Sequence, residues 1–223
     1  MLFSIPGIFA LLYVPSVLIV HGDPAATAHN IATSETLYRA GIVADLLGQA
    51  GFIWVTVVLY RLLRGVDSIL ALLMLVLSVV QMPIVFVSET SHLALLPLVH
   101  STGPWAALSE VQRNAQISLS LSSYQNGLLV TELFMGLWLF PFGVLIFKSG
   151  FLPRFLGVLL CVAGLAYVGE TFTWLLVPAY GSVVSEVASP LRALELVIPL
   201  WLLIMGAKDR PPEPFNAGAA RTE

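Results

Sequence analysis

Residues 137–168 read LWLFPFGVLIFKSGFLPRFLGVLLCVAGLAYV, two long apolar runs separated by a short stretch that favours a turn. Glycine is favoured at the position just after a helix, and proline is favoured in the first turn of a helix. Gly150 is therefore expected to end one helix and Pro153 to begin the next. Arg154 is expected to anchor this turn on the cytoplasmic face. Each run is part of an apolar segment of about 20 residues or more, long enough to cross the hydrocarbon core. The stretch predicts a helical hairpin in a membrane.

The whole chain has the composition of a membrane protein. Of its 223 residues, 58% are apolar and only 10% are charged, and its mean hydropathy is +0.92. Soluble domains carry about 25% charged residues, so this chain could not cover itself with a surface suited to water. With a net charge of −3, the chain lacks the excess of basic residues that is typical of nucleic-acid-binding proteins. We predict one integral membrane helical domain, residues 1–208, followed by a disordered cytoplasmic tail, residues 209–223.

Six apolar segments are predicted to span the membrane: 2–20, 38–63, 68–88, 119–147, 154–177 and 190–207. The first segment is similar to a signal peptide but lacks a basic n-region, so it is expected to be retained as a helix. The predicted fold class is therefore all-α, a polytopic transmembrane helix bundle.

The segment 89–118 is expected to interrupt this pattern. Pro97, Gly103 and Pro104 are expected to break any long helix there. From Pro104 onward, apolar side chains recur at three-residue steps, at Trp105, Leu108 and Val111. This spacing predicts an amphipathic helix on the outer face of the membrane. A short seventh span, 92–100, is the alternative.

The orientation follows from the distribution of Lys and Arg over the loops. One side carries seven basic residues: Arg61, Arg64, Lys148, Arg154, Lys208, Arg210 and Arg221. The other side carries three: Arg39, Arg113 and Arg192. The more basic side is predicted to be cytoplasmic, which places both termini in the cytoplasm and makes the chain a multi-pass membrane protein.

Four predicted spans carry an acid at bilayer depth, where a charged group costs roughly 3 kcal/mol. Asp45, Glu170 and Glu195 are expected in the outer half and Glu132 nearer the middle, while the inner halves are almost purely apolar. Such acids could simply pair across helices and tie the bundle together. Arg39 and Arg192 lie at outer helix ends, but two arginines leave two of the four acids unmatched. We therefore predict one shared polar pocket for a lipophilic small molecule.

Further residues are candidates for the lining of this pocket because they share depth or a helical face with the acids: Tyr167, Trp174, Tyr124, Gln125, Gln49, Arg39 and Arg192. Trp174 shares a face with Glu170 and could equally be ordinary packing. The His and Cys residues show no zinc-type spacing, so neither a metal nor another cofactor is predicted.

Four stretches resemble a large bacterial family of small polytopic membrane proteins, domain of unknown function 4386: YVPSVLIV, LYRAGIVADLLG, the opening stretch 137–168 and ELVIPLWLLIMGAK. The turn SGFLPRFLG, residues 149–157, is the most specific part. The resemblance implies the six-helix layout and a location in a bacterial inner membrane, and it implies no particular activity.

A looser resemblance in architecture is to integral membrane terpene cyclases, which use buried carboxylic acids without the metal-binding motifs of soluble terpene synthases. It implies a proton-initiated cyclisation or isomerisation (isomerase or lyase chemistry) of a prenylated substrate. Glu170 or Glu132 would be the general acid, and Asp45 and Glu195 would orient it or accept the last proton. The alternatives are a proton-coupled transporter or binding protein for a hydrophobic or cationic amphiphile, and a structural membrane protein without a ligand.

Overall fold

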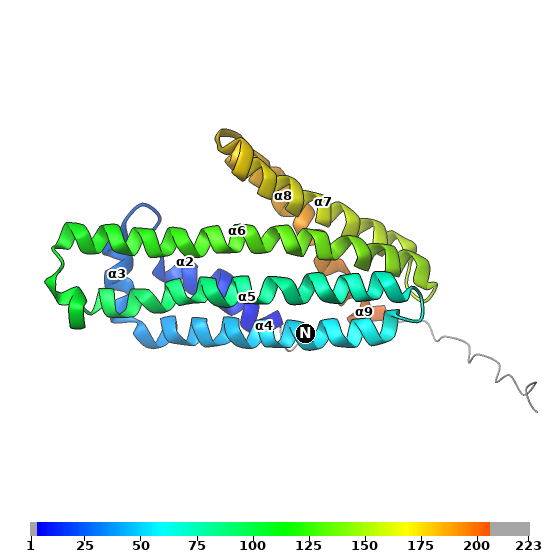
Figure 1. Cartoon of the computed structure of the whole chain (residues 1–223), viewed down its shortest axis with the longest axis horizontal. Coiled ribbons are helices and arrows are strands. Elements are labelled where there is room, and N and C mark those ends of the chain that lie inside the picture. Colours follow the sequence, from blue (N-terminus) through cyan, green and yellow to red (C-terminus); the bar gives the residue numbers. More distant parts are fainter. Residues whose placement is uncertain (1–3, 206–223) are drawn as a thin grey trace, which may run out of the picture.

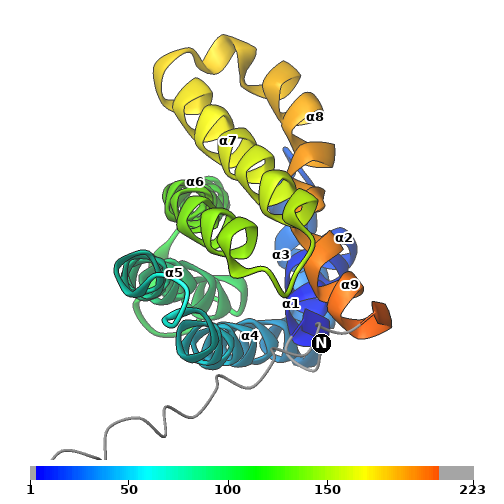
Figure 2. The same ribbon diagram turned by 90° about the vertical axis from the view of Figure 1, so that its right-hand side faces the viewer.

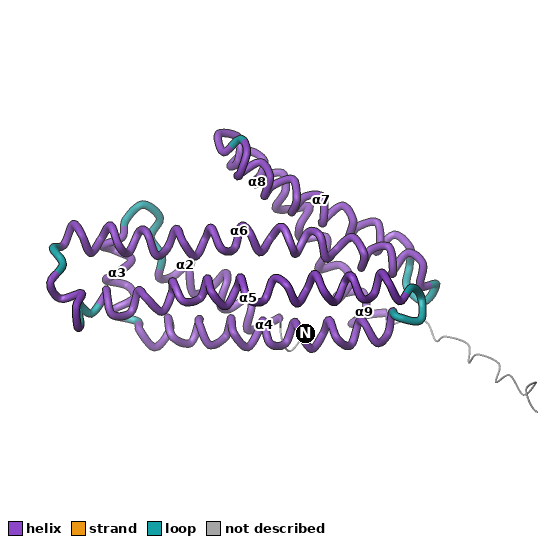
Figure 3. The backbone as a smooth tube through the Cα atoms, viewed as in Figure 1, coloured by secondary structure: helices purple, strands orange, loops and turns teal. Residues whose placement is uncertain are grey.

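A computed structural model describes residues 4–205 of the chain. Within this range the chain consists of helices joined by short turns, without a strand (Figure 3). The predicted tail 209–223 lies outside the described residues, together with Lys208, Arg210 and Arg221.

The chain begins with a short composite helix, α1 (Ser4–Ile8), a π-helical turn (Phe9–Tyr13) and α2 (Val14–Leu18), and continues with α3 (Pro24–Thr33). The longer helices are α4 (Glu35–Leu63), α5 (Ser68–Val99), α6 (Glu110–Ser149) and α7 (Arg154–Leu176). After them come α8 (Gly181–Arg192) and α9 (Val197–Met205). Three 3₁₀ turns connect the elements: Gly103–Ala107, Pro178–Tyr180 and Ala193–Leu196.

The described residues contain five segments long and apolar enough to cross a membrane: Glu35–Leu63, Ser68–Val99, Glu110–Ser149, Arg154–Leu176 and Pro178–Met205. One further apolar helix, Pro6–Leu18, is shorter than these five segments. At 1.5 Å per residue it is only about 20 Å long, less than the hydrocarbon thickness of about 30 Å. The prediction of a multi-pass helical membrane bundle is confirmed.

The opening stretch folds as predicted at its turn. α6 ends at Ser149, Gly150 adopts a left-handed conformation with φ of 73°, and Pro153 caps the first turn of α7. A left-handed residue just after a helix is where glycine is favoured, since it has no Cβ to clash.

The structure corrects two expectations for the segment 89–118. Pro97 does not break the helix, because it lies in the last turn of α5, where few hydrogen bonds remain to be lost. Residues 92–99 therefore belong to α5, with His100 as its C-cap, and 92–100 is not a separate span. The chain turns instead at Ser101 and Gly103, both with positive φ. The prediction of a separate outer amphipathic helix is also wrong. After the 3₁₀ turn, Ser109 and Gln112 form a capping box, and α6 begins at Glu110.

Three long helices, α4, α5 and α6, lie side by side and antiparallel, and α7 packs on α6 before it diverges with α8 from the bundle (Figures 1 and 2). Glycines allow the close approach of α6 and α7. A Cβ on Gly143 would lie 2.6 Å from the carbonyl oxygen of Gly157, and a Cβ on Gly136 would lie 2.9 Å from that of Gly164.

Two apolar clusters fill the bundle, one at each end. We call the end with the α4–α5 and α6–α7 turns the inner end, following the predicted orientation. The inner cluster is built around Leu63, Met74 and Leu139. The outer cluster is built around Leu18, Ile31, Leu95 and Ile117. Between these clusters lie several buried polar side chains, among them Asp45 and Glu89.

Candidate functional site

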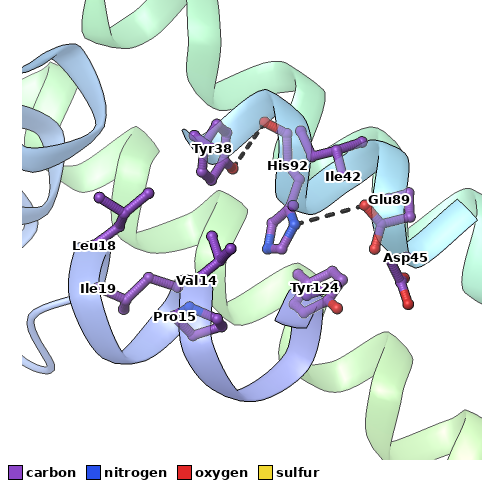
Figure 4. A pocket seen from close by; sticks show the side chains of 12 residues that line it. Val14, Pro15, Leu18, Ile19, Tyr38, Ile42, Asp45, Glu89, His92 and Tyr124 are labelled. Carbon is purple, nitrogen blue, oxygen red and sulfur yellow. Dashed lines mark hydrogen bonds and ion pairs between the residues drawn. The ribbon is translucent and has the colours of Figure 1, made fainter. Parts of the chain in front are cut away.

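One group of buried polar residues joins α4, α5 and α6, and we call it the Asp45–Glu89 site (Figure 4). Asp45 lies on α4, Glu89 and His92 lie one turn apart on α5, and Tyr124 lies on α6. The two carboxylic acids are each only 3% exposed. The His92 ring stacks on Tyr124 with centroids 3.7 Å apart. Three helices thus bring two acids, an imidazole and a phenol to one place.

Hydrogen bonds satisfy only part of this site. Gln49 donates to Asp45 Oδ1 at 3.3 Å, and the Tyr38 hydroxyl donates to the backbone carbonyl of His92 at 3.1 Å. His92 Nδ1 lies 3.6 Å from Glu89 Oε2, beyond hydrogen-bond distance. Among residues 4–205, Asp45 Oδ2, both Glu89 oxygens and His92 Nε2 have no hydrogen-bond partner.

A cavity of about 20 Å³ is lined in part by Asp45, Glu89, His92 and Tyr124. Its far wall is apolar and comes from the first helix, including Val14, Pro15 and Leu18 (Figure 4). The helix approaches closely because α4 has a glycine at this point, and a Cβ on Gly41 would lie 3.0 Å from Val14. A space of this size holds about one water molecule if several polar groups surround it. The site is therefore suited to a proton or a water, not to a large ligand.

The depth of the site follows from helix lengths. Glu89 is 21 residues from the inner end of α5 at Ser68, and Asp45 is 18 residues from the inner end of α4 at Leu63. At 1.5 Å per residue these separations are about 32 and 27 Å. The hydrocarbon core is about 30 Å thick. The Asp45–Glu89 site therefore lies at the outer boundary of the hydrocarbon if the inner helix ends mark the inner boundary.

A second group, which we call the Arg192 network, joins α6, α7 and α8. Arg192 Nη1 lies 2.7 Å from Glu132 Oε1 and 3.2 Å from Glu170 Oε2. Only the contact with Glu132 has hydrogen-bond geometry. The guanidinium also lies 5.2 Å from the centre of the Tyr167 ring, whose hydroxyl donates to Glu195 Oε1 at 2.9 Å. One arginine and one tyrosine thus hold three acids in a continuous polar network.

Comparison with known proteins identifies the family. The family model described as domain of unknown function (DUF4386) matches residues 1–206. The chain belongs to this family. Neither the curated proteins nor the solved structures contain a match. The resemblance to integral membrane terpene cyclases stays a prediction.

In this DUF4386 chain the four predicted acids do not share one chamber. Glu132, Glu170 and Glu195 meet in the Arg192 network, whereas Asp45 lies with Glu89. The two groups are offset along the bundle, since Tyr124 and Glu132 are eight residues apart on α6, about 12 Å. Residue spacing predicted neither this offset nor the direction in which each acid points around the bundle.

Of the other predicted pocket residues, some belong to one of these two groups and the rest lie elsewhere. Tyr124 and Gln49 belong to the Asp45–Glu89 site, and Tyr167 and Arg192 belong to the Arg192 network. The three remaining candidates, Trp174, Gln125 and Arg39, lie in neither group.

Each of these three has a different setting. Trp174 Nε1 donates to Ser185 Oγ at 3.1 Å, which fastens α8 to α7. Gln125 borders an outer crevice of about 260 Å³ beside residues 19–24. Arg39 forms an exposed ion pair with Glu35 at 2.5 Å.

Sequence reasoning missed Glu89, His92 and Tyr38 as site residues. Glu89 and His92 are three residues apart and so share a helical face, which was a usable signal. The expectation that Pro97 breaks the helix hides this signal, because it places both residues in an outer loop. No group of three or more His, Cys, Asp or Glu in the described range has the geometry to hold a metal ion.

Proposed function

We propose that the protein binds and releases a proton at the Asp45–Glu89 site, as the coupling step of a carrier for hydrophobic or cationic amphiphiles. The observation that carries this proposal is the set of unpaired, almost fully buried carboxylate oxygens beside a cavity the size of one water. The proposal places the carrier in a bacterial inner membrane, and the distribution of Lys and Arg favours an orientation with both termini in the cytoplasm.

Charge accounting supports a proton as the ligand. A buried polar atom without a hydrogen-bond partner costs about 1–3 kcal/mol, and more if it is charged. A proton on either Asp45 or Glu89 removes one negative charge and supplies an O–H donor for the other carboxylate. In this proposal His92, whose Nε2 has no hydrogen-bond partner among the described residues, exchanges that proton through a water in the cavity. Acid and histidine pairs of this kind form proton relays in membrane transporters.

The size of the cavity favours a carrier over an enzyme at this site. Pockets for small molecules usually measure about 300–1,000 Å³, whereas this cavity measures about 20 Å³. An amphiphile would reach the acids from the lipid by displacing the first helix, whose residues Val14, Pro15 and Leu18 form the apolar wall. The π-helical turn Phe9–Tyr13 lies within this helix, and such turns often occur at functional sites.

Reconstituted vesicles test the proposal. With an imposed pH gradient, wild-type protein is expected to take up a fluorescent cationic amphiphile, and Asp45→Asn and Glu89→Gln are each expected to lower the rate at least about 10-fold. Glu186→Gln is the matched control, because Glu186 is an exposed acid on α8. Uptake that ignores the pH gradient, or that both site variants retain in full, would overturn the proposal.

A terpene cyclase or isomerase is the second candidate, and one observation favours it. Three of the four predicted catalytic acids do meet, beside the ring of Tyr167. On this reading Glu170 protonates a lipophilic prenylated substrate that enters from the lipid, and no cofactor takes part. The test is whether product forms in detergent without a pH gradient. Product formation that is lost in Glu170→Gln but kept in Glu89→Gln would support the enzyme and refute the carrier.

A further inference from the structure

A second set of unpaired polar atoms lies deeper in the same three-helix bundle. Gln81 and Ser78 on α5 are 2% and 0% exposed, and Trp138 on α6 is 6% exposed. Within the described range, both amide atoms of Gln81, Ser78 Oγ and Trp138 Nε1 have no hydrogen-bond partner. The proton-binding proposal makes no use of these residues.

The packing of α5 against α6 places the three residues at similar depth. Gly127 lies directly against Ser88, since a Cβ on Gly127 would overlap the Ser88 hydroxyl. From this contact the two antiparallel helices run inward together. Ser78 is ten residues inward of Ser88, about 15 Å, and Trp138 is eleven residues inward of Gly127, about 17 Å. Gln81 lies one turn closer to the Asp45–Glu89 site.

The α4 helix agrees with this placement. The Trp138 ring packs against Phe52 with centroids 5.3 Å apart, and Phe52 is seven residues inward of Asp45, about 11 Å. Gln49, which donates to Asp45, lies between these two levels. The indole of Trp138 therefore lies inside the bundle, on the inner side of the carboxyl pair.

On α5 these polar groups form one stripe with the outer site. Ser78, Gln81, Ser88 and His92 recur at three-, seven- and four-residue steps, which keeps them on one face of a helix. The stripe runs for 14 residues, about 21 Å, from the outer boundary of the hydrocarbon toward its middle. Below it the core is apolar, with Leu63, Met74 and Leu139 fully buried.

We propose that Gln81, Ser78 and Trp138 hold a short chain of water molecules that extends the Asp45–Glu89 site inward as a proton relay. The amide, hydroxyl and indole groups orient the waters, and protons pass from water to water, each oxygen gaining one proton as it gives up another. The relay ends at the apolar cluster of Leu63, Met74 and Leu139, so this conformation blocks passage to the inner side. The relay depends on the proposed function for its proton, but the hydration itself does not.

The experiment measures water at Trp138 directly. The protein is placed in nanodiscs with its five tryptophans labelled at the indole nitrogen, and Trp138→Phe assigns the signal. Magnetisation transfer from water is expected to reach the Trp138 indole proton, and Gln81→Met, which removes the amide but keeps a long side chain, is expected to slow this exchange at least 10-fold. Val80→Met is the matched control, because it places the same side chain on the lipid-facing side of α5.

The outcomes separate the two proposals. A Trp138 indole that does not exchange with water in the wild type, or that exchanges equally in Gln81→Met, overturns the relay. If Gln81→Met fails to fold, Ser78→Ala removes a single hydroxyl and is expected to slow the exchange in the same direction. The infrared carboxyl band, assigned with Asp45→Asn and Glu89→Gln, reports proton binding independently. Loss of the titration with retained water exchange would refute the proposed function and keep the internal water.

Discussion

The imidazole of His92 stacks on the phenol ring of Tyr124 with an interplanar angle of 24°, which fastens α5 to α6 at the edge of the buried carboxyl pair. Tyr38 fixes the same segment of α5 from the other side through its hydrogen bond to the His92 carbonyl. Two tyrosines on two different helices thus hold His92, Tyr124 at its ring and Tyr38 at its backbone carbonyl.

Replacing the stacked tyrosine tests this contact. Tyr124→Leu is expected to lower the free energy of unfolding by about 1–2 kcal/mol, because stacking adds about 0.5–1.5 kcal/mol to the apolar burial of an aromatic side chain. Thermal or denaturant unfolding in detergent measures the change. Tyr180→Leu is the control, since Tyr180 is mostly exposed, and its effect should stay within about 0.5 kcal/mol. Equal effects of the two variants would contradict the stacking contribution.

The Arg192 network predicts a strong asymmetry between single and combined changes. Arg192→Met is expected to cost about 3–5 kcal/mol of stability, because it leaves the carboxyls of Glu132 and Glu170 without their cation. Adding Glu132→Gln and Glu170→Gln should recover most of that loss. Unfolding curves of the single and triple variants measure it.

The exposed ion pair of Arg39 with Glu35 supplies the comparison for that experiment. Arg39→Met should leave the stability almost unchanged, since exposed pairs contribute little. A triple variant that is no more stable than Arg192→Met would show that the network does not act through charge pairing.

Stability should depend on pH through the turn between α4 and α5. Asp67 accepts hydrogen bonds from the backbone N–H of Leu70 and from Lys148, each at 3.1 Å, and these hold the pKa of Asp67 below its ordinary value of 3.8. A carboxyl with a lowered folded pKa stabilises the fold above its unfolded pKa and loses this contribution as pH falls through the folded pKa. The stability difference between wild type and Asp67→Asn should thus be present at pH 7 and shrink below about pH 4.

Unfolding in detergent at several pH values measures this difference. Glu110→Gln is the control, an exposed acid at the start of α6. A difference between wild type and Asp67→Asn that is constant from pH 7 to pH 3 would contradict the assignment.

The glycine contact between α6 and α7 predicts opposite effects at two glycines. Gly143→Val is expected to destabilise by about 1–3 kcal/mol or prevent assembly, because its side chain would overlap the backbone of Gly157. Gly169→Ala, where nothing lies within 4 Å of the added Cβ, is expected to stabilise by about 0.4–1 kcal/mol. Unfolding in the same detergent compares the two. A tolerated Gly143→Val would mean that α6 and α7 can separate at little cost.

The sequence predicted the bundle well because a membrane span is a local property. Apolar length and the residues Gly150 and Pro153 are enough to place α6, α7 and the turn between them. The prediction at Pro97 was wrong because the sequence does not distinguish a proline tolerated in the last helical turn from a proline that ends a helix. The pairing of Asp45 with Glu89, and of Glu170 with Arg192, depends on how each helix is rotated about its axis. That rotation is set by packing between distant segments, which spacing alone does not encode.

The length of α6 has a consequence for the membrane itself. Its 40 residues measure about 60 Å, twice the thickness of a hydrocarbon core. Lipids with longer or shorter acyl chains would therefore shift the boundary of water along α6 and change how far the carboxyl pair lies from that boundary. Bilayer thickness would then set how readily this protein exchanges charge with its surroundings.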